Sequence, residues 1–139
     1  MGASHGIGHQ LGPLGVGHGE TSCVMLPSVL KWNYLHGNQD VKNAQQKVVE
    51  VFWEDEIIAS MLGGRGLIRD TADAGDLVGA LVSELGLPRS LKDVGVGRDK
   101  LDILAENSMK DRCLPTNPIP LKDKSQVLEI LGMAIDSET

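Results

Sequence analysis

The chain has 139 residues, the length of one domain and enough to bury about two thirds of its unfolded surface. Hydrophobic residues make up 41% of it and aromatic residues only 3%, so the core must consist of aliphatic side chains and methionine, which suits packed helices. The net charge of −6 argues against nucleic-acid binding, which needs a basic surface to neutralise phosphates. No apolar run has membrane-spanning length and no signal-peptide pattern is present, so we expect a cytoplasmic protein.

The first twenty residues are unusually rich in glycine, with seven in all. A glycine inside a helix costs about 1 kcal/mol relative to alanine, so a helix here needs a compensating reason. Close approach of the backbone to another helix or to a ligand is one such reason, and an unstructured N-terminus is the alternative. The pattern alone leaves both open.

Three of the four histidines lie in the same stretch, as His5, His9 and His18. On a helix, His5 and His9 share one face with their Cβ atoms about 5–6 Å apart, a spacing at which two imidazoles can bind one ion. The glycine-rich segment after them can fold back and bring His18 to the same point. This stretch is therefore the candidate metal or acid–base site, with Glu20 as the nearest carboxylate in the sequence.

Apolar residues further along the chain recur with helical spacing, and no strand pattern persists. Helices are predicted over residues 21–34, 41–53, 71–85, 97–108 and 122–134, with a further turn or short helix at 57–62. Pro27 should kink the first of these helices or restart it. Residues 33–40, which include His36, should form a loop before a helix capped by Asp40.

The helix over residues 71–85 has the clearest signals. Asp73 and Asp76 suit its first turn, where the helix dipole favours negative charge. Its apolar face should hold Leu77, Leu81 and Leu85, and Gly86 should end it. Before this helix, the glycine-rich run 63–66 with Arg65 is either a plain loop or a cradle for an anion.

Both cysteines, Cys23 and Cys113, lie in apolar surroundings in the sequence. We expect them to be reduced core thiols rather than a disulfide or a nucleophile. With these elements the chain is predicted to be a single all-α domain over residues 1–139, a bundle of five or six helices.

Several runs of residues together resemble the iron-containing (group III) alcohol dehydrogenase family, and its maleylacetate-reductase-like branch in particular. They are residues 2–12, 18–20, 26–27 and 33, then 85–95, and then 111–118 before the last helix. The runs occur in the family's order and span nearly the whole chain. The resemblance implies a truncated C-terminal domain of the dehydroquinate-synthase-like, iron-alcohol-dehydrogenase type, which is all-α.

In that family an N-terminal Rossmann-like domain holds NAD(P), and the C-terminal domain holds a divalent metal, usually iron or zinc. The resemblance implies that His5 and His18 are metal ligands. It places His9 between the metal and the nicotinamide, where it takes part in proton transfer. The metal would act as a Lewis acid on the substrate oxygen while hydride moves to or from the nicotinamide.

The chain departs from the family pattern in three respects. It has no glycine-rich strand–turn–helix unit, so NAD(P) binding by these residues alone is not expected. The family's other two ligands, an Asp and a His one turn apart, belong upstream of residue 1, so a site for Fe²⁺ or Zn²⁺ is incomplete here. The spacing from His5 to His18 is one residue shorter than in the family.

Three functions are left open, with an enzyme favoured. The first is a domain of an NAD(P)-linked dehydrogenase or maleylacetate reductase. The second is a non-redox dehydratase, isomerase or cyclase in which His5 and His9 act as acid and base on a small metabolite. The third is a non-catalytic interaction or regulatory module. Because helices that complete the family's domain are missing, we expect exposed apolar surface to be covered in a homo-oligomer or by another chain, which light scattering would reveal.

Overall fold

The computed structural model describes residues 2–135, and every regular element in that span is a helix. The α-helices are α1 (Ala3–Leu11), α2 (His18–His36), α3 (Gln39–Glu54), α4 (Glu56–Gly64), α5 (Ala74–Glu84), α6 (Leu101–Ser108) and α7 (Lys124–Ile135). Short 3₁₀ helices lie in the connections: η1 (Gly12–Leu14), η2 (Lys92–Val94) and η3 (Arg98–Lys100). The all-α prediction is confirmed. The α-helices within residues 2–135 number seven rather than five or six, because α1 is a complete helix in addition to α4.

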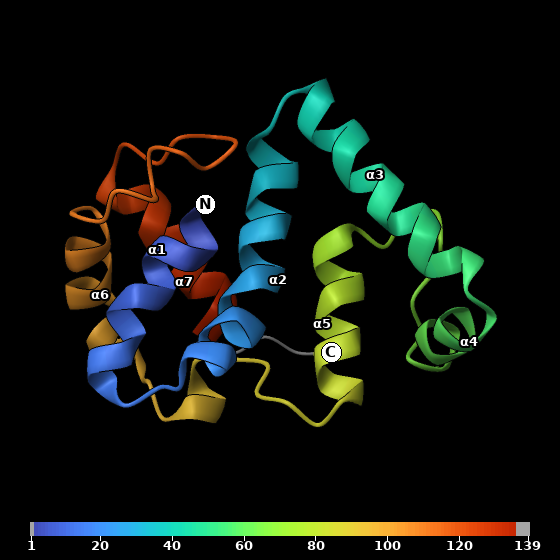
Figure 1. Cartoon of the computed structure of the whole chain (residues 1–139), viewed down its shortest axis with the longest axis horizontal. Helices are drawn as coiled ribbons and strands as arrows, with labels where there is room; N and C mark the ends of the chain where they lie inside the picture. Colours follow the sequence, from blue (N-terminus) through green and yellow to red (C-terminus); the bar gives the residue numbers. More distant parts are fainter. Residues whose placement is uncertain (1, 136–139) are drawn as a thin grey trace.

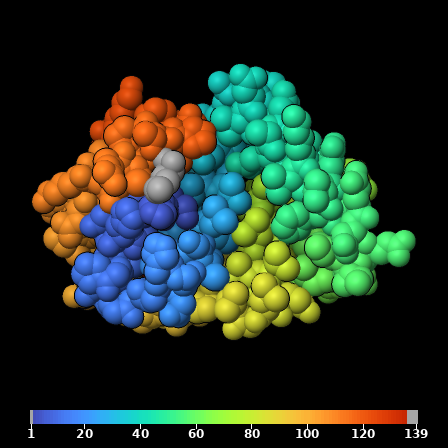
Figure 2. Space-filling model, in the orientation of Figure 1, coloured from blue at the N-terminus to red at the C-terminus, as the bar shows by residue number. Residues whose placement is uncertain are grey.

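The helices form two groups (Figure 1). α2 belongs to the larger group and lies on the side that faces the smaller one. The larger core is enclosed by α1, α2, α6 and α7 and contains the fully buried Ile7, Trp32 and Leu131. The smaller core, around Leu62 and Leu77, is enclosed by α3, α4 and α5. Figure 2 shows the N-terminal residues in blue against the orange residues of the segment that leads to α7. Side chains from that segment can therefore reach α1.

The glycines of α1 allow two neighbouring segments to approach its backbone closely. A Cβ at Gly6 would lie 2.5 Å from Leu114 Cδ1 and 3.3 Å from Cys113 Cβ. A Cβ at Gly8 would lie 3.2 Å from Thr21 Cβ, near the start of α2. A larger residue at either position would displace a neighbour, so close packing explains the glycines. The alternative of an unstructured N-terminus is wrong for this segment.

α2 is longer than the sequence predicts, and it runs through Pro27 without restarting. The loop expected over residues 33–40 shrinks to two residues, and His36 is the last residue of α2 rather than part of a loop. Asn38, not Asp40, caps α3. The side-chain oxygen of Asn38 accepts a hydrogen bond from a backbone N–H of α3 at 3.1 Å, which holds the two helices at a sharp turn.

α5 begins with the two acidic residues that the sequence assigns to its first turn. Asp73 is the N-cap and Asp76 is the third helical residue, and each carboxylate accepts a hydrogen bond from the other's backbone N–H, at 2.9 and 3.1 Å. This reciprocal pair satisfies two donors at the helix start. Lys31 of α2 forms ion pairs with both carboxylates, at 3.0 and 2.8 Å, and so joins α5 to α2.

Two smaller predictions change at the ends of α4 and α5. Gly86 ends α5 as predicted, with φ at +72°, but Leu85 is exposed and does not belong to the buried face. Residues 63–64 of the predicted loop belong to α4. Arg65 contacts Glu84 at 2.8 Å, so its guanidinium is already engaged by an acidic side chain.

Neither cysteine forms a disulfide: Cys23 in α2 is half-buried and Cys113 is buried. The prediction of unpaired thiols is confirmed, but the predicted core position holds for Cys113 and not for Cys23. None of the described helices is long and apolar enough to cross a membrane.

We expect Gly75→Ala to destabilise the fold, because α5 crosses α2 at this glycine. A Cβ at Gly75 would lie 2.5 Å from the carbonyl oxygen of Pro27, a backbone atom that cannot rotate away. Overpacking of this kind costs about 1–3 kcal/mol, whereas alanine gains only about 1 kcal/mol in helix propensity. Urea unfolding should therefore show a lower midpoint for Gly75→Ala.

Gly132→Ala in α7 is the matched control, because no atom lies within 4 Å of the added Cβ. It should leave the midpoint unchanged or raise it by up to about 1 kcal/mol. A stabilising effect of Gly75→Ala equal to that of Gly132→Ala would contradict the close crossing.

Candidate functional site

The three N-terminal histidines converge at the junction of α1 and α2. His5 and His9 lie one turn apart on α1, with their ring centres 4.4 Å apart. His18 is the first residue of α2, and η1 turns the chain back so that its ring centre lies 5.8 Å from that of His5. His5 is half-buried, and His9 and His18 are exposed. The predicted convergence of these side chains is therefore present in the structure.

The pair His5 and His18 fits the role of ligands to one ion in its spacing and chemistry. Two imidazoles bound to one zinc or iron ion, each at about 2.1 Å, place their ring centres about 5–6 Å apart. The observed 5.8 Å lies in that range. Two ligands are fewer than the three or four that hold such an ion in proteins, so an ion at this pair would need further ligands from elsewhere.

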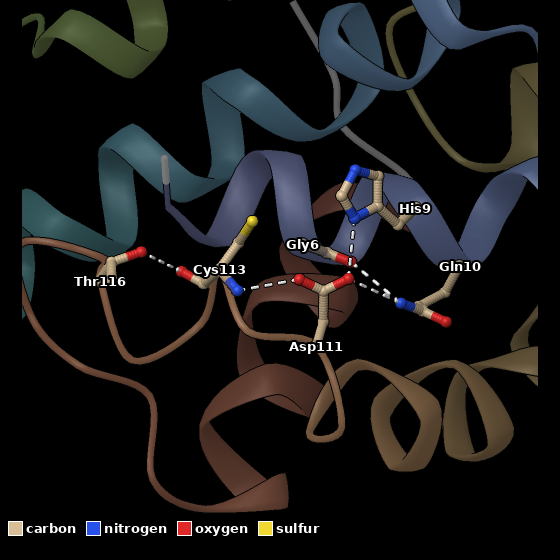
Figure 3. A network of polar contacts seen from close by, with 6 residues as sticks. All are labelled: Gly6, His9, Gln10, Asp111, Cys113 and Thr116. Atoms are coloured by element: carbon tan, nitrogen blue, oxygen red, sulfur yellow. Dashed lines mark hydrogen bonds and ion pairs between the residues drawn. The ribbon is translucent and has the colours of Figure 1, made fainter.

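His9 has a carboxylate partner from the other end of the chain (Figure 3). Asp111 Oδ2 lies 2.7 Å from His9 Nδ1 and also accepts a hydrogen bond from Gln10 Nε2 at 3.3 Å. Asp111 Oδ1 accepts a hydrogen bond from the backbone N–H of Cys113 at 2.9 Å. An ionised carboxylate only accepts hydrogen bonds, so the proton of His9 belongs on Nδ1 and the lone pair of Nε2 stays available.

Hydrogen bonds keep the Asp111 carboxylate charged. Burial alone raises the pKa of Asp111, but the hydrogen bonds from Cys113 and His9 outweigh it and bring the pKa below its usual value. The opposite holds for the Cys113 thiol, whose pKa is raised by burial first and by the adjacent Asp111 second. Without a metal, Cys113 is therefore a neutral thiol near pH 7 and a poor nucleophile.

Asn117 holds the segment that carries Asp111 against α1. Its side-chain oxygen accepts a hydrogen bond from the backbone N–H of Ala3 at 3.1 Å, at the start of α1. Its amide nitrogen donates to Asn33 Oδ1 of α2 at 2.7 Å and to the carbonyl oxygen of Ile119 at 2.9 Å. Both asparagines are buried, so these bonds form away from water and fix the position of the segment.

Asp111 is a candidate site residue that reasoning from sequence did not assign. It lies in the run 111–118, which carries part of the family resemblance, but 102 positions separate it from His9. Glu20, the nearest carboxylate in sequence, instead lies beside Gly17, where a Cβ would be 2.8 Å from Glu20 Oε1. His36 lies apart from the cluster, with its ring 4.5 Å from that of Trp32.

The fold and the histidine cluster together define an all-α domain with three histidines gathered at the junction of two helices. The chain belongs to the iron-containing alcohol dehydrogenase family, because the family model "Fe-containing alcohol dehydrogenase family, C-terminal" matches residues 1–135. The family expected from the sequence motifs is therefore confirmed.

Relatives and a solved structure agree with this assignment. Dehydrogenase ALT3 of Alternaria alternata is 51% identical over 134 residues, which cover 96% of this chain and 35% of that protein. Alcohol dehydrogenase 4 of Saccharomyces cerevisiae is 30% identical over 137 residues, 98% of this chain and 32% of that one. A crystal structure of 1,3-propanediol oxidoreductase matches with a TM-score of 0.64 and 28% identity, over 97% of this chain and 33% of that chain. The chain spans about a third of the length of these relatives.

We expect Asp111→Asn to lower the free energy of unfolding at neutral pH. In acid, where Asp111 of the wild-type chain is protonated, this difference between the two proteins should disappear. The folded-state pKa of Asp111 lies below its ordinary value of 3.8, so the carboxylate stabilises the fold above that pH. This stabilisation disappears as the pH falls through the lower folded-state pKa. Loss of hydrogen bonds to a charged group should cost about 1–3 kcal/mol at pH 7.

Urea unfolding at pH 7 and at a series of pH values below 4 measures this difference. Asp70→Asn changes an exposed aspartate outside the site and should alter stability by less than about 0.5 kcal/mol at pH 7. A constant difference between wild type and Asp111→Asn at every pH would show that the carboxylate charge does not support the fold.

Proposed function

We propose that this chain is the metal-binding and proton-transferring half of an NAD(P)-linked oxidoreductase acting on a small alcohol or carbonyl compound. The convergence of His5, His9 and His18, with Asp111 bound behind His9, carries this proposal. The family assignment supports it, and so do the names of two matched proteins, an alcohol dehydrogenase and a 1,3-propanediol oxidoreductase.

Each histidine has a separate role in this proposal. His5 and His18 would hold Fe²⁺ or Zn²⁺, and the bound ion would polarise the substrate oxygen. His9 carries a proton to or from the substrate at Nε2, while Asp111 keeps its ring oriented through Nδ1. The nucleotide and the remaining metal ligands come from outside these residues, either from a longer chain or from a partner.

Finer assignments extend the same proposal. The runs 85–95 and 111–118 support placing the chain in the maleylacetate-reductase-like branch of the family. We further propose a cytoplasmic location and a homo-oligomeric or complexed state. Exposed apolar side chains such as Ile57, 83% exposed in α4, and Leu35, 62% exposed in α2, support a covered surface.

A non-redox acid–base enzyme is the second candidate, and the His9–Asp111 contact favours it. An imidazole with its proton fixed on Nδ1 by a carboxylate is a general base that needs no nicotinamide. In that case, the chain alone would transform a small metabolite, and His9→Gln would abolish the reaction. Dependence of turnover on NAD(P) would argue against this second candidate.

A domain exchange tests the proposed dehydrogenase function. The matching third of Dehydrogenase ALT3 from Alternaria alternata, 51% identical, would be replaced by this chain. The chimera should reduce or oxidise nicotinamide with the same substrate as the intact relative. His18→Ala in the chimera should lower turnover by more than about 100-fold, because even partners outside the ligand set contribute about 10–100-fold.

His36→Ala is the matched control, because His36 contacts Trp32 and Glu129 rather than the cluster. It should leave turnover unchanged. A folded chimera that binds metal but shows no turnover with nicotinamide, while the intact relative does, would contradict the proposed function.

A further inference from the structure

We propose that His9, Asp111 and Cys113 form a second divalent-metal site, separate from the pair His5 and His18 and suited to Zn²⁺. A ring nitrogen of His9, a carboxylate oxygen of Asp111 and Sγ of Cys113 all lie within 4.8 Å of one another. Within residues 2–135, no other group of three or more His, Cys, Asp or Glu side chains meets that spacing. The three ligands come from this chain alone, unlike the family's ligand set.

The spacing of these atoms requires only small side-chain movements to enclose an ion. In a tetrahedral zinc site with ligands at about 2.0–2.3 Å, the ligand atoms lie about 3.3–3.8 Å apart. Two of the atoms are already closer than that, since His9 Nδ1 and Asp111 Oδ2 are 2.7 Å apart. Sγ of Cys113 needs to approach by up to about 1.5 Å, which rotation about its Cα–Cβ bond can supply.

The backbone around the three ligands is held in place. Gly6 lets the loop lie on α1, where a Cβ would be 3.2 Å from Asp111 Oδ1 and 3.3 Å from Cys113 Cβ. Asn117 fixes the same loop to the start of α1 through the backbone N–H of Ala3. The site is therefore largely formed before a metal arrives, which lowers the cost of binding.

The ligand types favour zinc and cobalt over magnesium and calcium. One thiolate, one imidazole and one carboxylate form a mixed set that hard cations with oxygen preference do not select. Cys113 is buried and Asp111 is nearly so, whereas His9 is exposed, so the site opens to solvent on one side. Three protein ligands with an open fourth position are typical of zinc sites that bind water or substrate.

Binding displaces protons from the ligands. The thiol of Cys113 must lose its proton to bind, and where His9 binds through Nδ1 the ion replaces the proton shared with Asp111. Without a metal, the same three residues form the hydrogen-bonded network of Figure 3. The experiment must therefore distinguish a network that accepts an ion from one that does not.

Titration of the reduced, untagged chain with Co²⁺ alone tests the proposal. Co²⁺ bound to a thiolate gives a near-ultraviolet charge-transfer band, so absorbance reports the cysteine directly. The proposal predicts about one Co²⁺ per chain with this band, and loss of the band when Zn²⁺ is added. Cys113→Ser should remove the band and weaken binding by more than about tenfold.

Three further variants assign the ligands. Cys23→Ser changes the other cysteine and should keep the band. His9→Gln changes an exposed side chain and should weaken Co²⁺ binding in a folded protein, as judged by circular dichroism. The double variant His5→Ala/His18→Ala removes the other pair and should keep both band and affinity.

A wild-type chain that gives no thiolate band, or a band that survives Cys113→Ser, would overturn the second site. Co²⁺ bound without a thiolate band and lost in the His5→Ala/His18→Ala variant would place the ion at that pair. That outcome would overturn this inference and leave the proposed function intact, so the two failures are distinguishable.

Discussion

The structure depends on one contact, the packing of the segment 111–117 against the glycine face of α1. Asn117 joins this segment to the start of α1 and to α2 by one hydrogen bond each, and Gly6 gives it room to lie on the helix. Through this contact Asp111 reaches His9, and the larger core is closed between the two ends of the chain. Without it, the histidines would remain near one another but lack an acidic partner.

The same contact explains why a poor helix sequence forms a buried helix. Each glycine in α1 costs about 1 kcal/mol relative to alanine, and Gly6 and Gly8 both lie in its interior. The packing that they permit, against the segment near Leu114 and against Thr21, offsets that cost by burying apolar surface and satisfying polar groups. The free energy gained by this packing thus outweighs the poor helix propensity of the glycines, as is common where function constrains a sequence.

Reasoning from sequence succeeded where local pattern determines the outcome. Apolar spacing predicted α3, α5 and α7 to within a few residues, and the acidic first turn of α5 was predicted from Asp73 and Asp76. It was insufficient where tertiary contacts determine the length of a helix or the partner of a side chain. Three features depend on partners distant in sequence: the few residues by which α2 extends beyond its predicted range of 21–34, the helical state of α1, which the pattern left open, and the contact of Asp111 with His9. The convergence of the three histidines was predictable, because glycines and spacing limit where the chain can turn.

The position of the proton on His9 tests the central contact most directly. Long-range proton–nitrogen NMR correlations of the metal-free chain, recorded at mildly alkaline pH, report which ring nitrogen is protonated. If Asp111 holds His9, the proton will lie on Nδ1 of His9 in the wild-type chain, and the pattern will change in Asp111→Asn. A proton on Nε2 in the wild-type chain, or the same pattern in both proteins, would show that Asp111 does not hold His9.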